Sequence, residues 1–143
     1  MVSPGDHLDR THHLWDTSLI LHVLVVDDDE AVLGLMEAIL SAPQCAVDLI
    51  SNPLEAVERF SAHHYDLVIT DLQMPKMTGL ELAAAIRALD KHVPIILVTG
   101  TPQKLSLAQL TEAGVTRLIH KPMRVAELTR IRDGLQRQEK VSG

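Results

Sequence analysis

Short apolar runs alternate with amphipathic stretches along most of the chain, and this alternation predicts repeated strand–helix units. Five runs rich in branched aliphatic side chains are typical of buried strands. They are Val23–Val26, Ala46–Ile50, Leu67–Thr70, Pro94–Val98 and Thr116–His120. Because strands that alternate with helices form parallel sheets covered on both faces, we expect an α/β fold with five parallel strands and five helices.

Apolar residues at helical spacing predict a helix after each strand. The expected apolar faces are Val32, Leu35, Met36, Ile39 and Leu40, ended by Pro43; Ala56, Val57 and Phe60; and Val125, Leu128, Ile131 and Leu135. The arginines Arg124, Arg130, Arg132 and Arg137 lie mostly off the last face. Gly79–Leu89 reads as the third helix. Asn52–Pro53 and Thr101–Pro102 predict helix starts, the second helix running to about Gly114.

Composition narrows the class of protein. Apolar residues make up 46% of the chain, enough for one sizeable core. The net charge of −6 argues against direct binding to nucleic acid. A single cysteine, Cys45, allows no internal disulfide and fits a reducing compartment. No apolar run has the length of a membrane span and no secretory pattern opens the chain, so we expect a cytoplasmic protein without membrane insertion.

The chain divides into three expected segments. Residues 1–21 read as an extension, which fits a linker, a cloning remnant or an ordered arm anchored by Trp15. Residues 22–139 hold the strand–helix pattern, and residues 140–143 form a tail too short to fold. The long first segment and the abrupt end fit either a stand-alone domain or one cut from a larger protein.

Charged and hydroxyl residues follow the predicted strands at the ends where such sheets bind ligands. Asp27 and Asp28 follow the first strand, and Asp71 follows the third. Thr99 lies at the end of the fourth strand, and Lys121 follows the fifth. Clustered carboxylates repel one another unless a cation compensates, and oxygen ligands suit Mg²⁺. A carboxylate there can attack phosphorus, while an ammonium and a hydroxyl stabilise the transferring group.

Each of these residues also has an ordinary structural explanation. A single aspartate after a strand is usually a turn former or a helix cap, and we expect Asp29 and Glu30 to open the first helix in this way. A lone Lys–Pro is usually a loop. The functional reading depends on all the residue types occurring in order, each directly after a predicted buried strand.

The segments VLVVDDDE, YDLVITDLQMPKMTGLEL, PIILVTG and HKP resemble the receiver domain of bacterial two-component response regulators. The resemblance covers residues 22 to about 138 and implies a flavodoxin-like doubly wound sheet in the order 2-1-3-4-5. It implies that Asp71 is the phosphoacceptor. Asp27, Asp28, Asp71 and the backbone carbonyl of Gln73 are then the implied ligands of Mg²⁺.

The same resemblance implies further roles. Thr99 is similar to the switch hydroxyl and Lys121 to the lysine that contacts the phosphoryl group, with a cis bond to Pro122. Gly100 resembles the small residue beside that group. Met74, Pro75 and Gly79 resemble the loop that shapes the acceptor.

Two positions depart from the family's pattern, and two others tune it. Leu118 stands where an aromatic side chain is usual, which puts the usual coupling of Thr99 to the output face in question. His120 stands where an apolar residue is usual; a partly buried, hydrogen-bonded histidine is the ordinary reading and a pH sensor the alternative. Gln73 and Thr101 occupy positions that tune autodephosphorylation.

The resemblance also implies partners. The expected phosphodonor is a histidine kinase or a histidine phosphotransfer domain, and the expected recipient is a downstream protein or a fused output domain. The chain also fits the end of a hybrid sensor kinase, and a homodimer is compatible with the family. The family's reporting surface corresponds here to Gln103, Gln109, Leu118, Arg124 and Glu127, each of which is otherwise a solvated surface residue.

Three other functions compete. A haloacid-dehalogenase-like phosphatase would use Asp27-x-Asp29, but Ala31 stands where that family has threonine or valine. A flavodoxin-like cofactor module would need a glycine- and hydroxyl-rich phosphate loop instead of acids after the first strand. A receiver-shaped module that binds partners without phosphorylation is favoured only by Leu118.

Overall fold

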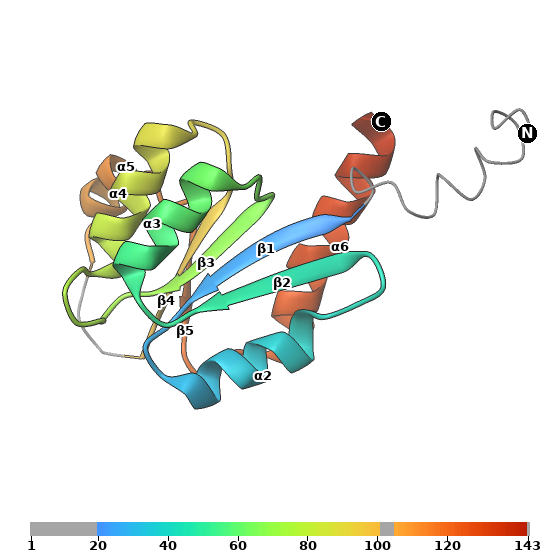
Figure 1. Ribbon diagram of the computed structural model, residues 1–143, viewed down its shortest axis with the longest axis horizontal. Helices are drawn as coiled ribbons and strands as arrows, with labels where there is room; N and C mark the ends of the chain where they lie inside the picture. The colour runs from blue at the N-terminus through green and yellow to red at the C-terminus, as the bar shows by residue number, and fades with distance from the viewer. Residues whose placement is uncertain (1–19, 101–104, 143) are drawn as a thin grey trace, which may run out of the picture.

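A five-stranded parallel sheet in the order β2-β1-β3-β4-β5 forms the centre of the molecule (Figure 1). The computed structural model describes residues 20–100 and 105–142, with side chains described as far as Gln136. The strands are β1 (Leu21–Val26), β2 (Cys45–Ile50), β3 (Leu67–Asp71), β4 (Ile95–Thr99) and β5 (Arg117–His120). The helices are α2 (Glu30–Leu40), α3 (Pro53–Ala62), α4 (Gly79–Leu89), α5 (Leu107–Ala113) and α6 (Val125–Ser142). The predicted fold class and strand order are confirmed.

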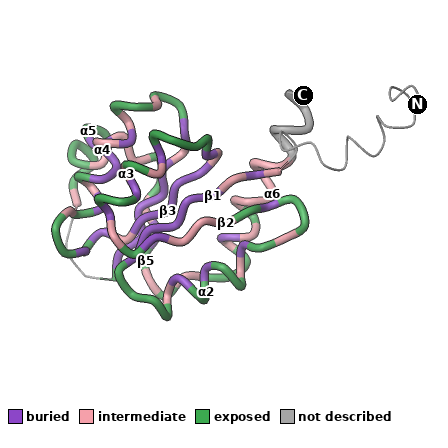
Figure 2. Tube along the Cα trace, viewed as in Figure 1, coloured by how far each residue is buried: buried purple, intermediate pink, exposed green. Residues whose placement is uncertain are grey.

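Alternate residues of the central strands face two separate hydrophobic cores, as their period of two requires. Leu24 and Val68 pack against α3, α4 and α5 on one face, whereas Val23 and Ile69 pack against α2 and α6 on the other. Figure 2 shows β1 and β3 as mostly buried, whereas β2 beside them is mostly intermediate. Burial on both faces fixes the register of the central strands β1, β3 and β4, so the loops at their carboxyl ends start from a rigid base.

Two helix starts follow local sequence signals as predicted. Asn52 is the N-cap of α3 and its side chain accepts a hydrogen bond from the Leu54 N–H at 3.0 Å, with Pro53 in the first turn. Asp29 caps α2 in the same way, accepting from the Ala31 N–H at 2.9 Å. The chain therefore enters α2 directly from the acidic residues that follow β1.

The predicted apolar faces of α2 and α6 need correction. In α2 the buried residues are Leu33, Met36 and Leu40, while Leu35 is 52% exposed. The buried residues are three and four positions apart and form one stripe toward the sheet, which Leu35 misses. Val125, the first residue of α6, is 57% exposed, so the buried part of that helix begins at Leu128.

The helix predicted to run from Thr101–Pro102 to about Gly114 starts later. Thr101 and Pro102 lie outside the described residues, and Leu105 and Ser106 are not helical. α5 begins after Ser106, whose hydroxyl accepts from the Gln109 N–H at 3.0 Å while the Gln109 side chain accepts from the Ser106 N–H at 2.9 Å. This reciprocal capping box satisfies two free donors at the start of the helix.

Helix α6 is joined to α2 by polar contacts that the periodicity did not predict. Arg132, expected off the packed face, donates to the carbonyls of Ile39 and Leu40, each at 3.3 Å, and so caps the end of α2. The helix continues to Ser142, past the boundary predicted at residue 139. Neither α6 nor any other helix in the described part of the chain combines the length and hydropathy needed to cross a membrane.

Candidate functional site

The first strand brings two aspartates to the carboxyl edge of the sheet. Asp27 follows β1 and is 4% exposed, whereas Asp28 is exposed. One Asp27 carboxylate oxygen accepts a hydrogen bond from the Asp29 N–H at 2.9 Å, which orients the side chain over the edge. Because Asp29 itself caps α2, it is Asp28 and not Asp29 that joins Asp27, which argues against the Asp27-x-Asp29 pairing of a phosphatase.

Lys121, just after β5, connects the first and third strands electrostatically. Its ammonium nitrogen lies 3.4 Å from Oδ1 of Asp71, the last residue of β3, and 3.6 Å from Oδ2 of Asp27. The side chains of Asp71 and Asp27 are 11% and 6% exposed, so water screens these ion pairs weakly. The structure thus brings together three of the residues that sequence reasoning selected.

The three aspartates form a group suited to a hard cation. Carboxylate oxygens of Asp27, Asp28 and Asp71 all lie within 4.8 Å of one another. Three carboxylates against the one ammonium of Lys121 leave a surplus of negative charge in a partly buried place. An all-oxygen donor set with that charge fits Mg²⁺, which binds through one or two carboxylates and keeps several waters.

Burial raises the pKa of both buried carboxyl groups. For Asp27, desolvation is the main cause, and the charges of Asp71 and Asp28 add to it, whereas the Asp29 N–H and Lys121 oppose it. For Asp71, desolvation again raises the pKa, and Lys121 and the Leu72 N–H lower it. The site therefore holds its negative charge at a cost in stability that a bound cation would relieve.

Thr99 and Lys121 are held side by side by the pairing of β4 and β5. Thr99 is 1% exposed at the end of β4, and its carbonyl accepts from the Lys121 N–H at 2.9 Å. The Lys121–Pro122 bond is cis, as predicted. A Cβ on Gly100 would lie 3.3 Å from Cδ of Lys121, so the small residue leaves the lysine its path to the carboxylates.

Gly79 allows helix α4 to start in contact with the backbone of Asp71. A Cβ at this position would lie 2.2 Å from the Asp71 carbonyl oxygen and 2.7 Å from a methyl group of Leu97. The Gly79 N–H donates to the Leu72 carbonyl at 2.7 Å, which closes the loop between β3 and α4. No other residue type fits here without displacing the backbone that carries Asp71.

The loop that Gly79 closes contains a residue in the left-handed region. Lys76 has φ of 75°, and the Met77 N–H donates to the Pro75 carbonyl at 2.8 Å across it. This is a tight turn that an L side chain adopts at some cost. Met74 is buried and Gln73 exposed; a role for the Gln73 carbonyl stays a prediction.

The remaining predicted positions have mixed outcomes. His120 is exposed, so the expectation of a partly buried histidine is wrong: on the four-residue edge strand β5 its side chain points to solvent. Leu118 is half-buried. Gln109 belongs to the capping box of α5, while Thr101 and Gln103 lie outside the described residues.

Sequence reasoning did not connect the apolar residues beneath the carboxylates with the site. Met36 and Met123, with Val32, line a small hollow of about 10 Å³ that also touches Asp27 and Asp71. Their low polarity is part of what desolvates the two acids. No local signal could have identified them, because methionines at helical spacing or after a proline are read as ordinary core residues.

Comparison with known sequences identifies one family. Residues 23–132 match the profile of the response regulator receiver domain. ResD, a transcriptional regulatory protein of Bacillus subtilis, is 33% identical over 121 residues, which cover 84% of this chain and 50% of that protein. The sensor kinase/phosphatase LuxQ of Vibrio vulnificus is 32% identical over 109 residues, covering 76% of this chain and 13% of LuxQ. The chain thus spans half or less of the length of these relatives.

Solved structures agree on the fold. The receiver domain of a sensor histidine kinase from Pseudomonas aeruginosa, described with a magnesium ion coordinated in its active site cleft, has a TM-score of 0.72 and 27% identity. It covers 82% of this chain and 98% of its own. A CheY-like receiver domain from Methanospirillum hungatei has a TM-score of 0.75 and 25% identity, covering 87% and 99%.

Proposed function

Because the chain belongs to the response regulator receiver domain family, we propose that it accepts a phosphoryl group on Asp71 and changes conformation to signal to a partner. Receiver domains are signalling modules of two-component systems, generally without enzymatic activity of their own, and they interact with histidine kinases or phosphotransfer proteins. The observation that carries the proposal is the position of Lys121, within 3.4 Å of Asp71 and 3.6 Å of Asp27.

Asp71 is the proposed nucleophile. One of its carboxylate oxygens attacks the phosphorus of the donor, forming an acyl phosphate, while the bond from phosphorus to the donor breaks and its electron pair leaves with the donor. The donor atom that takes this electron pair is an imidazole nitrogen in a phosphohistidine and an acetate oxygen in acetyl phosphate. Asp71 suits this role because it ends a strand buried on both faces, which fixes its direction of approach.

Lys121 and Thr99 are proposed to stabilise the phosphoryl oxygens. The Lys121 ammonium already lies beside the Asp71 carboxylate and would follow the negative charge as it spreads onto the incoming group. Thr99 is the last residue of the neighbouring strand β4, and its hydroxyl would donate a hydrogen bond to one phosphoryl oxygen. Gly100 leaves space next to Lys121 for the enlarged side chain.

Asp27, Asp28 and Asp71 are proposed to hold Mg²⁺, with the Gln73 carbonyl as a further ligand. When bound, the ion would neutralise charge on the carboxylates and on the phosphoryl oxygens. The surplus charge of the cluster supports this assignment. So does the structural neighbour described with magnesium in its active site cleft.

The setting of the domain is also part of the proposal. The receiver, expected over residues 22–139, would lie in the cytoplasm, and β1 and α6 extend its elements to Leu21 and Ser142. Its phosphodonor would be a histidine kinase or a histidine phosphotransfer domain. Similarity to a sensor kinase and to a transcriptional regulator supports an origin in a hybrid kinase or a longer regulator. The recipient would be a downstream protein or a fused output domain, with no direct contact to nucleic acid. The homodimer that the family allows would be one form of the active state.

Phosphorylation of the chain can be tested by intact-mass measurement. The protein is incubated with acetyl phosphate, with and without Mg²⁺, beside Asp71→Asn. We expect one Mg²⁺-dependent, base-labile phosphoryl adduct on the wild type and none on the variant. Asp133→Asn, which changes an aspartate on α6 away from the cluster, is the matched control and should still form the adduct.

A folded wild-type protein that forms no adduct under any of these conditions would contradict the proposal. The second candidate would then apply, a receiver-shaped module that binds partners without phosphorylation. Leu118 favours that candidate because the family's usual aromatic side chain is missing from this half-buried position on β5. An adduct on Asp71→Asn equal to that on the wild type would move the phosphoacceptor to another residue.

A further inference from the structure

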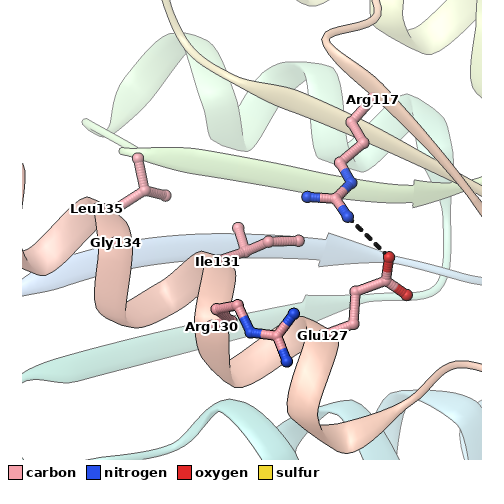
Figure 3. A pocket seen from close by; sticks show the side chains of 6 residues that line it. All are labelled: Arg117, Glu127, Arg130, Ile131, Gly134 and Leu135. Atoms are coloured by element: carbon pink, nitrogen blue, oxygen red, sulfur yellow. Dashed lines mark hydrogen bonds and ion pairs between the residues drawn. The ribbon is translucent and has the colours of Figure 1, made fainter.

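A hollow at the amino edge of the sheet has no part in the proposed phosphorylation. It measures about 230 Å³ and lies where the neighbouring helices α3 and α4 end, opposite the edge that carries the carboxylates. The residues that line this amino-edge hollow include Phe60, Ser61, Tyr65, Leu89 and Asp90. By contrast, the hollow of about 270 Å³ between β5 and α6 contains the ion pair of Arg117 with Glu127 and belongs to the expected reporting surface (Figure 3).

The amino-edge hollow has an aromatic floor and an exposed leucine at its rim. The rings of Phe60 and Tyr65 are stacked with their centroids 5.9 Å apart, and both residues are buried. Leu89, the last residue of α4, is 53% exposed. One exposed leucine is ordinary on a protein surface, but this one borders an open space above two buried rings. The hollow therefore suits a large apolar side chain, and an aromatic one gains most because rings pack favourably on rings.

A hydrogen-bond acceptor is also available at the hollow. Asp90 uses one carboxylate oxygen, Oδ1, to accept from the N–H groups of His92 and Val93 at 2.8 and 3.1 Å. In the described part of the chain no hydrogen bond reaches its other oxygen, Oδ2. A tryptophan that becomes buried needs an acceptor for its indole N–H, whereas leucine and phenylalanine need none. The hollow thus offers an indole both an apolar floor and a polar partner.

The chain before β1 starts from the same edge. The His22 N–H donates to Oδ2 of Asp66 at 2.8 Å, and the Asp66 N–H donates to the His22 carbonyl at 2.7 Å. The start of β1 is therefore fixed beside Asp66, the residue directly after Tyr65. Trp15, which lies outside the described residues, comes six positions before Leu21. At about 3.3 Å per residue this length spans at most about 20 Å, which is enough to reach the hollow.

We propose that Trp15, in the segment before β1, occupies the amino-edge hollow of its own domain. The indole ring would lie against Phe60 and Tyr65, and its N–H would donate to Oδ2 of Asp90. These three aromatic residues are all that the chain contains, so they would form one cluster. A short tether gives Trp15 an effective concentration on the order of millimolar, which favours it over a free partner. The inference concerns the edge opposite the proposed phosphorylation site and does not rest on the proposed function.

Fluorescence can test the position of Trp15 because it is the only tryptophan in the chain. Acrylamide quenching is measured on the full-length wild type and on single variants. We expect the wild-type indole to be protected relative to N-acetyltryptophanamide. Leu89→Glu, which places a charge at the rim, and Ser61→Phe, which fills the space, should raise quenching to the level of that free derivative. Leu54→Glu changes a leucine that is 46% exposed at the other end of α3, and this matched control should keep the protection.

Nuclear Overhauser effects supply a second readout of the same contact. Cross-peaks between the indole protons of Trp15 and the methyl groups of Leu89 should be present in the wild type and lost in Ser61→Phe. Full exposure of Trp15 in the folded wild type would overturn the inference, and so would protection that folded Leu89→Glu and Ser61→Phe both retain. Protection that appears only as the protein concentration rises would also overturn it, because the indole would then come from a second copy of the chain.

Discussion

Two aspartates at opposite ends of the sheet have opposite effects on stability. Asp27 lies at the carboxyl end of β1, where burial raises its pKa. Asp90 lies just before β4 at the amino end, where hydrogen bonds from the His92 and Val93 N–H groups, at 2.8 and 3.1 Å, lower its pKa. The charged form of Asp27 destabilises the fold, whereas the charged form of Asp90 stabilises it.

The difference separates a site for chemistry from a structural turn. At the amino end the aspartate satisfies backbone donors of its own loop, so no ligand is needed. At the carboxyl end the group of Asp27, Asp28 and Asp71 carries more negative charge than Lys121 balances. A stability cost concentrated at one edge is typical of a functional site.

The largest expected effect concerns the metal at the carboxyl end. Asp27→Asn combined with Asp28→Asn should reduce Mg²⁺ affinity by about 100-fold or more, since even groups that only orient metal ligands contribute about 10–100-fold. Calorimetric titration with Mg²⁺ measures this. Asp90→Asn is the matched change at the other end and should leave the affinity unaltered; an equal loss there would erase the contrast between the two ends.

The close packing at the carboxyl end should also appear in unfolding experiments. Gly79→Ala places a Cβ 2.2 Å from the Asp71 carbonyl and should lower the free energy of unfolding by about 2–3 kcal/mol. Gly34→Ala, in α2 with nothing within 4 Å, should raise it by about 0.5–1 kcal/mol. Urea denaturation of both variants checks the signs. A neutral Gly79→Ala would mean that the loop moves aside at little cost.

The two aspartates themselves can be compared by substitution in metal-free buffer at neutral pH. Asp90→Ala should lower the free energy of unfolding by about 1–2 kcal/mol, because two backbone donors lose their acceptor. Asp27→Asn should raise it by about 1 kcal/mol, because the buried charge disappears while the amide oxygen can still accept from the Asp29 N–H. Thermal melts with EDTA measure both, and a destabilised Asp27→Asn would reverse the interpretation of that site.

The effect of Asp90 should depend on pH in a defined direction. Its pKa is lowered in the folded state, so its contribution is complete above the unfolded value of 3.8 and is lost as the pH falls through the folded pKa. The deficit of Asp90→Ala relative to the wild type should therefore be constant near neutrality and shrink below about pH 4. A deficit that stays constant down to acid unfolding would show that the charge is not the cause.

The smallest expected effect is spectroscopic and concerns Tyr65, at the amino end before β3. Its hydroxyl donates to Asp48, and burial together with this hydrogen bond raises its pKa to about 12. Because Tyr65 is the only tyrosine in the chain, its ionisation can be followed by ultraviolet absorbance as the pH is raised. Asp48→Asn should lower the midpoint toward the ordinary value of about 10. An unchanged midpoint would assign the shift to burial alone.

Much of the fold and site could be predicted because the signals are local. The period of apolar residues identified all five strands, and Asn52 and Asp29 were recognised as caps from the residues beside them. In a parallel sheet all strands end at the same edge, so Asp27, Asp71, Thr99 and Lys121 could be expected together before any distance was known. That reasoning needed only the order of residue types along the chain.

Other features depend on partners distant in sequence. The exposure of Leu35 and of His120 is decided by which side of an element meets the sheet, and the contact of Arg132 with the end of α2 joins residues more than ninety positions apart. The raised pKa of Asp27 likewise arises from burial under other elements. The sequence by itself determined which chemical groups reach the edge of the sheet, because a helix after each strand makes the strands parallel and brings their carboxyl ends to one edge. Only the tertiary structure decided how deeply these groups are buried, because burial is created when separate elements pack.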